Sequence, residues 1–370
     1  MLSNMKEIFK QIRDIENAHF FRSLEKKTQV VSPLHNKGLK NYKNRLTHSY
    51  EVSSAAEQIL MNLNISDEQK ILYSYRVRGA SLLHDSGHPP FGHEGAKLLN
   101  KIFKSKGLKE GFSDNNNNLV VIEKSGIKIA FYLKASIIKY PNKIYDYQKD
   151  FYLKILESSI NEDIVNFPQF KVLEKPTRTF ACEVMDIADE NSYLTSDLAD
   201  AIVAKIIKKN VILKELDLII SQLNNKKLLR QIYSLKISIK TDDKSSVRFS
   251  LLGIQELLND NYYVSDNLKL ISIDEELEEF KKVLYRINKK LFIHSPALKI
   301  NRIKELDMFN EFISFVLQNE IFLSKTYKKR YFKSNNEDDK LRVLRDMIAE
   351  RDDIYIMEKL EEFKKGLKND

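Results

Sequence analysis

Four residues with side chains that commonly bind divalent cations are spread over three apolar stretches of this sequence. His48 lies in the first stretch, the adjacent pair His84-Asp85 ends the apolar run GASLL, and Asp189 lies far downstream. Imidazole nitrogens and carboxylate oxygens together suit a borderline or hard divalent cation such as Mn, Fe, Mg, Co or Zn. We therefore predict a divalent metal site formed by His48, His84, Asp85 and Asp189.

Two further histidines follow at once in the segment HDSGHPPFGHEGA, at positions 88 and 93. With His35, just upstream of His48, five of the seven histidines of the chain fall in or near these runs. A single buried histidine is usually an ordinary core residue, but scattered histidines would not cluster with aspartates in this way. The cluster therefore indicates a chemical site rather than simple packing.

The elements that must position these residues are predicted to be helices. The chain has only 10 Gly and 7 Pro and no Trp, and Leu, Ile, Lys and Glu are abundant. Apolar spacing predicts helices over residues 1–31, 46–60, 66–85, 180–207 and, as several segments, 266–365. We expect loops at 32–44, at SGHPPFGHEG with a helix restarting near Gly95, and at SDNNNN, and a short strand pair or mobile insertion at SIKTDDKSSVRFS.

One face of the helix predicted over 180–207 carries an unusual row of polar residues. Asp186, Asp189, Tyr193, Asp197 and Asp200 recur at helical spacing and share one stripe. Four carboxylates in a row repel each other unless cations or hydroxyl donors lie beside them. A solvated acidic face is the alternative, but the rest of this helix is strongly apolar. A metal at Asp189, a sugar against Tyr193 and a hydroxyl bonded to Asp197 would explain the stripe.

Composition limits the setting and the partners. The net charge of +9, from 61 basic and 52 acidic residues, favours polyanionic partners such as nucleoside triphosphates or nucleic acid, although a Lys-rich solvated surface gives the same excess. The single cysteine, Cys182, excludes a disulfide framework and fits a reducing compartment. With no apolar run of 18 residues and no signal-peptide pattern, we expect a soluble, cytoplasmic protein without a membrane partner.

The order of these motifs resembles a known family. His48, His84-Asp85 and Asp189 are similar to the H…HD…D signature of HD-domain metal-dependent phosphohydrolases. More narrowly, FFRSLEKKTQV, NRLTHSYEVSSAA, LLHDSGHPPFGHEG, ASIIKYP and EVMDIADENSYLTSDLAD resemble the bacterial dGTP triphosphohydrolase (dGTPase) family in order and approximate spacing. Weaker similarity at LFIHSPAL and VLRDMIAERDDIYIMEKL extends the resemblance over roughly residues 8–360.

The resemblance implies a fold and a reaction. The fold would be all-α, an HD-domain helical bundle with additional C-terminal helices and at most a short strand pair. Residues 1–210 would form the metal- and nucleotide-binding core, and residues 211–370 a helical region packed on it. The reaction would be hydrolysis of a deoxynucleoside triphosphate, dGTP or a broader range, to the deoxynucleoside and inorganic triphosphate, with water attacking the α-phosphorus.

The resemblance also implies roles for single residues. The four predicted metal ligands keep that role. It implies that His88 and His93 face the α-phosphate and act in catalysis, and we add the neighbouring acid Glu94 as a catalytic candidate. Substrate contacts are assigned to Arg45, Lys139 and Tyr140 near the phosphates, Tyr193 on the deoxyribose, and Gln29 and Asp197 at the 3′-hydroxyl. A tyrosine packed on the sugar would select deoxy substrates, because it leaves little room for a 2′-hydroxyl.

Two positions depart from the family pattern. The family usually has an acid three residues after the second catalytic histidine, where this chain has Ala96, and a glutamate where this chain has Ser113. Glu94 and Asp114 are the acids nearest in sequence that could compensate. If no acid takes over, activity would fall by about 10²–10⁴-fold, the usual contribution of a positioned acid or base.

Two alternatives to an active triphosphohydrolase follow. The first is a nucleotide-binding or regulatory HD protein with weakened catalysis, and the second is a nucleic-acid-binding HD protein. The resemblance further implies a homo-oligomer and allosteric control by a dNTP or single-stranded DNA. Base preference, native metal and subunit number stay open at this stage.

Overall fold

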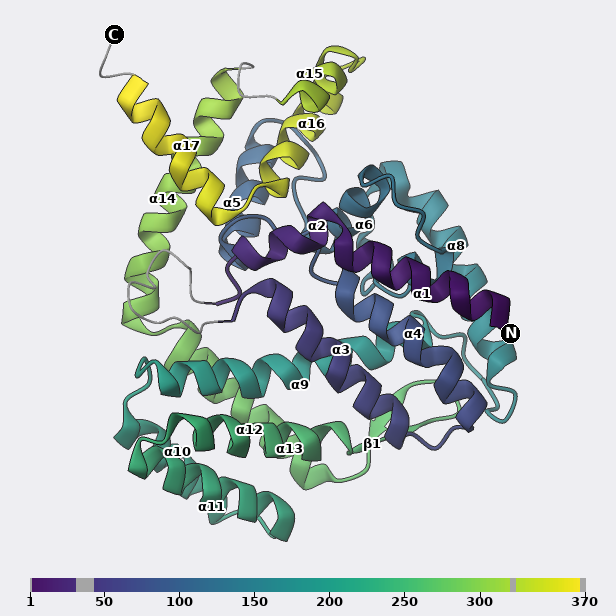
Figure 1. The fold of residues 1–370 in the computed structure, drawn as a ribbon, viewed down its shortest axis with the longest axis vertical. Coiled ribbons are helices and arrows are strands. Elements are labelled where there is room, and N and C mark those ends of the chain that lie inside the picture. Colours follow the sequence, from purple (N-terminus) through teal and green to yellow (C-terminus); the bar gives the residue numbers. More distant parts are fainter. Residues whose placement is uncertain (1, 31–42, 320–323, 367–370) are drawn as a thin grey trace.

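The fold was examined in a computed structural model that describes residues 2–30, 43–319 and 324–366 (Figure 1). Within these ranges the chain folds into helices joined by short connections, with one antiparallel strand pair, β1 (Tyr262–Val264) and β2 (Leu270–Ser272). The predicted all-α class is confirmed. No helix in these ranges is long and apolar enough to cross a membrane.

Helices of the first half build the part of the molecule that carries the predicted metal ligands. They are α1 (Leu2–Asn17), α2 (His19–Arg22), η1 (Ser23–Lys26), α3 (Arg45–Asn62), α4 (Asp67–Leu83), α5 (Gly92–Ser105), α6 (Asp114–Lys124), α7 (Phe131–Ala135), η3 (Pro141–Lys143), α8 (Asp146–Asn166) and α9 (Phe180–Val203). Helices α3, α4 and α9 pack directly on one another around a shared apolar core that includes Val52, Val77 and Ala188.

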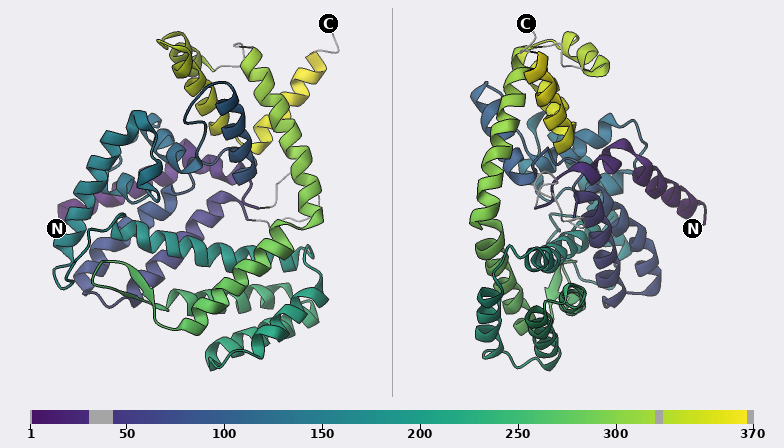
Figure 2. Two further views of the ribbon diagram at one scale, coloured as in Figure 1. Left: turned by 180° about the vertical axis from the view of Figure 1, so that it is seen from behind. Right: turned by 60° about the vertical axis from the view of Figure 1, so that its left-hand side comes forward.

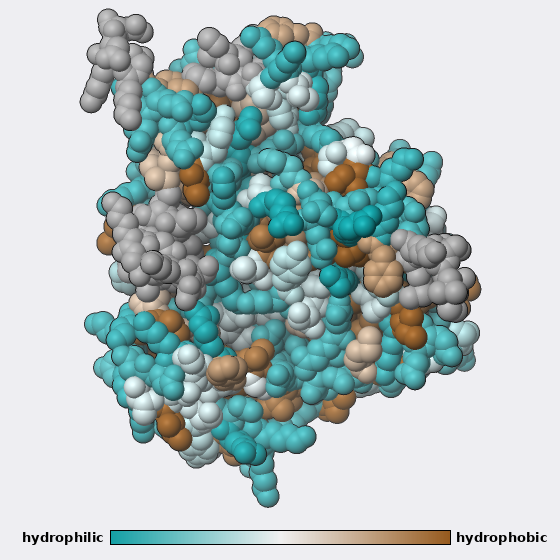
Figure 3. Space-filling model, in the orientation of Figure 1, coloured by the Kyte–Doolittle hydropathy of each residue, from teal (hydrophilic) through white to brown (hydrophobic). Residues whose placement is uncertain are grey.

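Helices of the second half extend from both ends of this core. They are α10 (Lys209–Ile220), α11 (Lys226–Thr241), α12 (Lys244–Asn259), α13 (Glu275–Ile287), the π-helix η4 (Asn288–Ile293), α14 (Pro296–Gln318), α15 (Lys325–Phe332), α16 (Glu337–Glu350) and α17 (Asp353–Gly366). Figure 2 shows α14 running along the molecule, from the group α10–α13 to the group α15–α17. On the face in Figure 3 hydrophobic residues are dispersed among hydrophilic ones.

Local signals explain where the three central helices begin. At α3, the Asn44 side chain accepts the backbone N–H of Thr47 at 2.9 Å while Thr47 accepts that of Asn44, a reciprocal cap. Ser66 and Gln69 form the same arrangement at α4. At α9, the Asp163 carboxylate accepts the N–H of Phe180 at 2.7 Å. These caps satisfy donors that a helix start leaves free and so fix the starts of the helices that carry the site.

Helix α9 belongs to two apolar cores. Its first half packs in the core of α3 and α4, and its second half, from Leu194, packs with α10–α13. A third core joins α5 to α14, α16 and α17. The predicted division near residue 210 follows the end of α9 and remains a prediction.

Two sequence-based expectations about local structure were wrong. SIKTDDKSSVRFS holds no strand: α11 ends at Thr241, Asp242 takes a left-handed conformation (φ 59°), and the Asp243 side chain caps α12 by accepting the Ser246 N–H at 3.1 Å. The Asp-Asp pair thus forms a helix–helix turn, and the strand pair lies further on, at β1 and β2.

SDNNNN is likewise not a loop but the start of α6, with Ser113 as its cap. The side chains of Asn116, Asn117 and Asn118 are buried, and the amides of Asn117 and Asn118 bind backbone carbonyls of the loop after α4, which compensates their low helix propensity. In addition, the helix after SGHPPF restarts at Gly92 rather than Gly95, and the helix predicted over 1–31 is interrupted after Asn17. Most of the loop predicted at 32–44, with His35, lies outside the described residues.

Candidate metal centre and adjoining cavity

Three of the four predicted metal ligands converge from three different helices. His48 comes from α3, His84 from the C-cap of α4 and Asp189 from the middle of α9. One donor atom of each lies within 4.8 Å of the other two. His48 Nε2 is 3.0 Å and His84 Nε2 is 3.5 Å from the same oxygen, Asp189 Oδ1.

These spacings fit a bound divalent cation. Ligand atoms about 2.0–2.2 Å from one cation lie about 3.0–3.5 Å apart in tetrahedral or octahedral arrangements. His84 Nδ1 contacts the carbonyl oxygen of Ser81 at 2.6 Å, which assigns the proton to Nδ1 and leaves the Nε2 lone pair available. That Nε2 is buried and has no hydrogen-bond partner among the described residues. The donor set therefore fits the predicted metal.

The fourth predicted ligand, Asp85, lies at the edge of this group. Its Oδ1 is 3.5 Å from His84 Nε2, and its Oδ2 accepts a hydrogen bond from Arg45 Nη1 at 2.6 Å. One carboxylate oxygen thus remains on the side of the metal site. Arg45, predicted near the phosphates, is buried against Asp85. In this structure its guanidinium group orients the Asp85 carboxylate, a predicted metal ligand.

The electrostatics keep both carboxylates ionised, as metal ligands must be. Burial opposes ionisation of Asp189, but the charges of Lys139 and His84 hold the pKa of its carboxyl well below the usual range. For Asp85, burial is again outweighed, here by His88 and Arg45, and its pKa is also well below the usual range. Lys139 Nζ lies 2.7 Å from Asp189 and 2.9 Å from Asp186. Asp186 and Asp189, two carboxylates of the polar stripe on α9, therefore share the Lys139 ammonium group.

A second group of three side chains lies next to the first. It comprises His88 from the loop after α4, His93 at the start of α5 and Asp114 at the start of α6. Asp114 Oδ2 is 3.2 Å from His93 Nδ1 and 3.3 Å from His88 Nε2. On its other side, His88 Nδ1 lies 3.0 Å from Asp85 Oδ1. Burial and the Arg45 charge lower the pKa of His88 to about 4, so its ring is neutral at pH 7.

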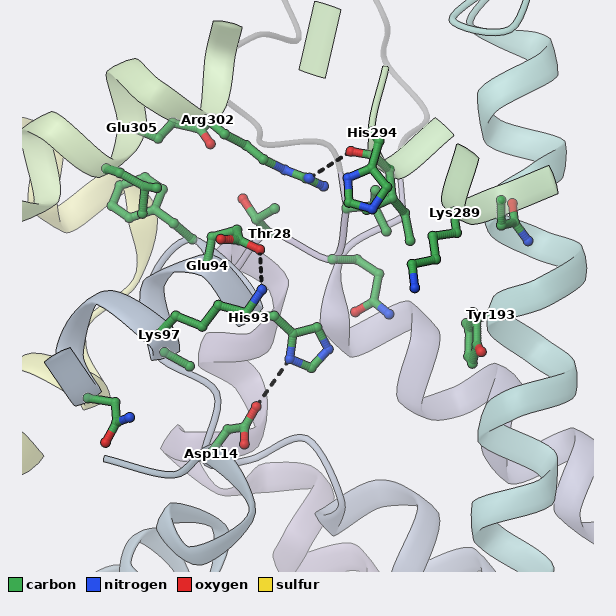
Figure 4. Close-up of a pocket in the computed structure, with 18 of the residues that line it drawn as sticks. Thr28, His93, Glu94, Lys97, Asp114, Tyr193, Lys289, His294, Arg302 and Glu305 are labelled. Atoms are coloured by element: carbon green, nitrogen blue, oxygen red, sulfur yellow. Dashed lines mark hydrogen bonds and ion pairs between the residues drawn. The ribbon is translucent and has the colours of Figure 1, made fainter. Parts of the chain in front are cut away.

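A cavity of about 570 Å³ adjoins this second group (Figure 4). Its size lies within the range of small-molecule sites. His93 and Glu94 border it from α5, Tyr193 from α9, and Gln29 from the segment after η1. The Gln29 side-chain oxygen is buried and has no hydrogen-bond partner among the described residues. These four predicted site residues therefore face one space.

Other predicted substrate residues do not border this cavity. Lys139 is bound to the two aspartates of α9. Tyr140 is 46% exposed and its ring lies under the ammonium group of Lys143. Asp197 is buried, and burial together with Asp200, Glu51 and Asp189 raises the pKa of its carboxyl to about 8 although Lys43 opposes the shift. Asp197 is therefore a protonated, neutral acid at pH 7.

Sequence analysis missed the cations of the cavity wall. Lys97 borders it from α5, Lys289 from η4 and Arg302 from α14, and their labelled side chains surround the space in Figure 4. Arg302 is held by a hydrogen bond from Nη1 to the carbonyl of Ile293 at 2.8 Å. The only sequence signal was the run LFIHSPAL, which lies between Lys289 and Arg302 and was assigned no role. A π-helix such as η4 often occurs at functional sites.

Comparison with known proteins supports the resemblance found in the sequence. No protein-family model matches the chain. A "deoxyguanosinetriphosphate triphosphohydrolase-like protein" of Rickettsia felis is 29% identical over 95% of this chain and 90% of its own length. A protein of the same name from Rickettsia bellii is also 29% identical, over 95% of this chain and 90% of its own length. Among solved structures, a hypothetical protein from Aquifex aeolicus covers 90% of this chain with 18% identity and a TM-score of 0.36. The chain is thus similar to dGTPase-like proteins along nearly its whole length.

Proposed function

We propose that this protein is a metal-dependent hydrolase that converts a deoxynucleoside triphosphate to the deoxynucleoside and inorganic triphosphate. The observation that carries this proposal is the convergence of His48, His84 and Asp189 beside a cavity that His93 enters and that cations border. The names of the curated relatives support the same class of substrate.

The protein's own side chains suit the handling of a triphosphate. Lys97, Lys289 and Arg302 lie where they can neutralise phosphate oxygens, and Arg302 offers a planar fork for two of them. When bound at His48, His84, Asp85 and Asp189, a divalent cation would supply further charge neutralisation at the reacting phosphorus.

The reaction needs one bond to form and one to break. A water oxygen bonds to the α-phosphorus, the bond from that phosphorus to O5′ breaks, and O5′ leaves with a proton as the 5′-hydroxyl of the deoxynucleoside. The water oxygen remains in the inorganic triphosphate. We assign the proton donation to O5′ to His93, because its side chain is 71% exposed, borders the cavity and can act as a general acid.

Selection of the deoxy sugar is assigned to Tyr193 and Gln29. Both border the cavity, and the Gln29 oxygen, for which the described part of the chain offers no hydrogen-bond partner, can accept a hydrogen bond from a sugar hydroxyl. A sugar packed against the Tyr193 ring leaves no space for a 2′-hydroxyl. Asp197 lies one helical turn beyond Tyr193 on α9 and does not border the cavity, so no contact with the sugar is assigned to it.

The test is a panel of the four dNTPs and the four NTPs, assayed with Mn, Mg, Co, Fe or Zn and with a chelator. We expect metal-dependent release of triphosphate from at least one dNTP, and slower turnover of the matching NTP by about tenfold or more. The His84→Ala/Asp85→Ala double variant should lose both bound metal and activity. His19→Ala, which removes an exposed histidine remote from the cavity, is the matched control.

Two results would contradict the proposal. One is retention of stoichiometric metal in the double variant, which would place the metal elsewhere. The other is equal turnover of GTP and dGTP, which would remove the sugar selection. The alternative of a binding protein with weakened catalysis rests on Ala96, and it predicts dNTP binding without triphosphate release in the same panel.

A further inference from the structure

The carboxylate of Asp114 lies next to both histidines that are proposed to act in catalysis. It is the first residue of α6, and its Oδ2 faces His93 Nδ1 at 3.2 Å and His88 Nε2 at 3.3 Å. His93 is exposed to the cavity and His88 is buried behind it. The only acid beside His93 in sequence, Glu94, binds Lys97 at 2.7 Å. Ala96, which also borders the cavity, offers no polar group.

Several contacts fix Asp114 in this place. Its other oxygen, Oδ1, accepts the N–H of Asn115 at 2.9 Å, so Oδ2 is the oxygen directed at the histidines. The Tyr145 hydroxyl accepts the N–H of Ser113, the preceding residue, at 2.7 Å. The Asn117 and Asn118 side chains donate to the carbonyls of Gly87 and His84, which ties α6 to the loop that carries His88.

We propose that Asp114 is the positioning residue of His93, and that it takes over the task of the acid that this chain lacks at position 96. This inference rests on the proposed function. The Asp114 carboxylate accepts a hydrogen bond from His93 Nδ1–H, which turns His93 Nε2 toward the cavity. In the acid form both ring nitrogens carry a proton, and Asp114 stabilises that charged ring. Nε2 then gives its proton to O5′ as the bond to phosphorus breaks, which leaves the neutral Nδ1–H ring still hydrogen-bonded to Asp114, and Asp114 keeps no proton itself. Such a pair holds the ring in one tautomer and one orientation.

The same three side chains could instead hold a second cation, since their donor atoms lie within 4.8 Å of one another. We favour the positioning role for Asp114, because His93 Nδ1 and Asp114 Oδ2 already form a hydrogen bond of 3.2 Å. A second metal equivalent bound through Asp114 would overturn the proposal.

The kinetic test compares Asp114→Asn with the wild-type holoenzyme. We expect kcat to fall by about 10²–10⁴-fold, with KM changed by less than about threefold, because the role lies in the proton transfer rather than in binding. The swapped variant Asp114→Asn/Ala96→Glu should recover at least about tenfold of the lost kcat, since residue 96 follows His93 by about one turn of α5. Asp150→Asn, which alters an exposed acid on α8, is the matched control.

A second readout does not depend on activity. In metal-free protein labelled with ¹⁵N-histidine, NMR at an alkaline pH where imidazole rings are neutral should show the His93 ring as the Nδ1–H tautomer, assigned by its absence in His93→Gln. Asp114→Asn should shift this signal, and after metal loading it should bind as much metal as wild type. An unshifted signal, an unchanged kcat or the loss of one metal equivalent in Asp114→Asn would each overturn the inference. If wild type hydrolyses no dNTP, the proposed function fails, and the NMR signal still decides whether Asp114 holds His93.

Discussion

At the scale of single residues, the polar stripe of α9 contains both ionised and neutral carboxyl groups. Asp186 and Asp189 share the Lys139 ammonium and are ionised, with the pKa of each carboxyl below its usual range despite burial. Asp197, two turns further on, is neutral at pH 7 because burial dominates there. One helix face can therefore present a metal ligand and a hydrogen-bond donor without mutual repulsion.

The neutral state of Asp197 predicts a pH-dependent stability. The pKa of its carboxyl is about 8 in the folded protein against 3.8 as the ordinary value, so the folded state binds the proton more tightly. Its contribution favours folding at low pH and is lost as the pH rises from about 4 through 8. The melting temperature of Asp197→Asn, measured relative to that of wild type at the same pH, should therefore rise between pH 5 and pH 8.5.

Thermal melting in a chelator measures this gain, and Asp266→Asn, at an exposed site, is the control. A melting-temperature difference between Asp197→Asn and wild type that stays constant over this pH range would show that Asp197 is ionised in the folded protein.

At the scale of elements, α17 ties the C-terminal helices to the loop of the proposed catalytic histidines. The buried carboxylate of Asp353, its first residue, accepts the N–H of Phe91 at 2.8 Å and the N–H of Thr28 at 2.9 Å. Lys27 Nζ donates to the carbonyls of His88 and Ala349. Phe91 has a left-handed backbone (φ 61°), a strained conformation that needs such support. The last helices thus hold the HPPFGH loop in shape.

Asp353→Ala should therefore destabilise the protein by at least about 2 kcal/mol, because two buried N–H groups lose their acceptor. It should also lower activity, since the loop that carries His88 and His93 is no longer fixed. Chemical denaturation and the triphosphate assay measure these effects. Glu358→Ala, at an exposed position of the same helix, should change neither by much. An unaltered free energy of unfolding in Asp353→Ala would show that the loop holds its shape without α17.

The same scale shows what sequence could predict. The apolar spacing of α3, α4 and α9 was strong enough to give these helices and the residues they carry. The asparagine run of α6 was misjudged as a loop, since its buried amides bind a loop that is distant in sequence. For the same reason, the sequence analysis assigned catalysis to Glu94 and named Asp114 only as a second acid that could compensate. Only the packing of α6 on the loop of His88 distinguishes them.

At the scale of the whole molecule, the proposed substrate cavity is formed by distant parts of the chain. Helix α5, the middle of α9, η4 and α14 each supply a wall, and Figure 4 shows their side chains directed at one space. Lys289 and Arg302 could not be predicted as partners of His93, because their approach depends on how α14 folds back on α5. The metal donors His48, His84 and Asp189 were expected together from motif order, and the structure brings one donor atom of each within 4.8 Å of the other two.

The most direct test of the central claim is hydrolysis of a dNTP in ¹⁸O-labelled water with the metal-loaded protein, followed by mass spectrometry of both products. The account predicts one ¹⁸O atom in inorganic triphosphate and none in the deoxynucleoside, because water attacks the α-phosphorus and O5′ leaves. Release of pyrophosphate or orthophosphate in place of triphosphate, or ¹⁸O in the deoxynucleoside, would contradict it.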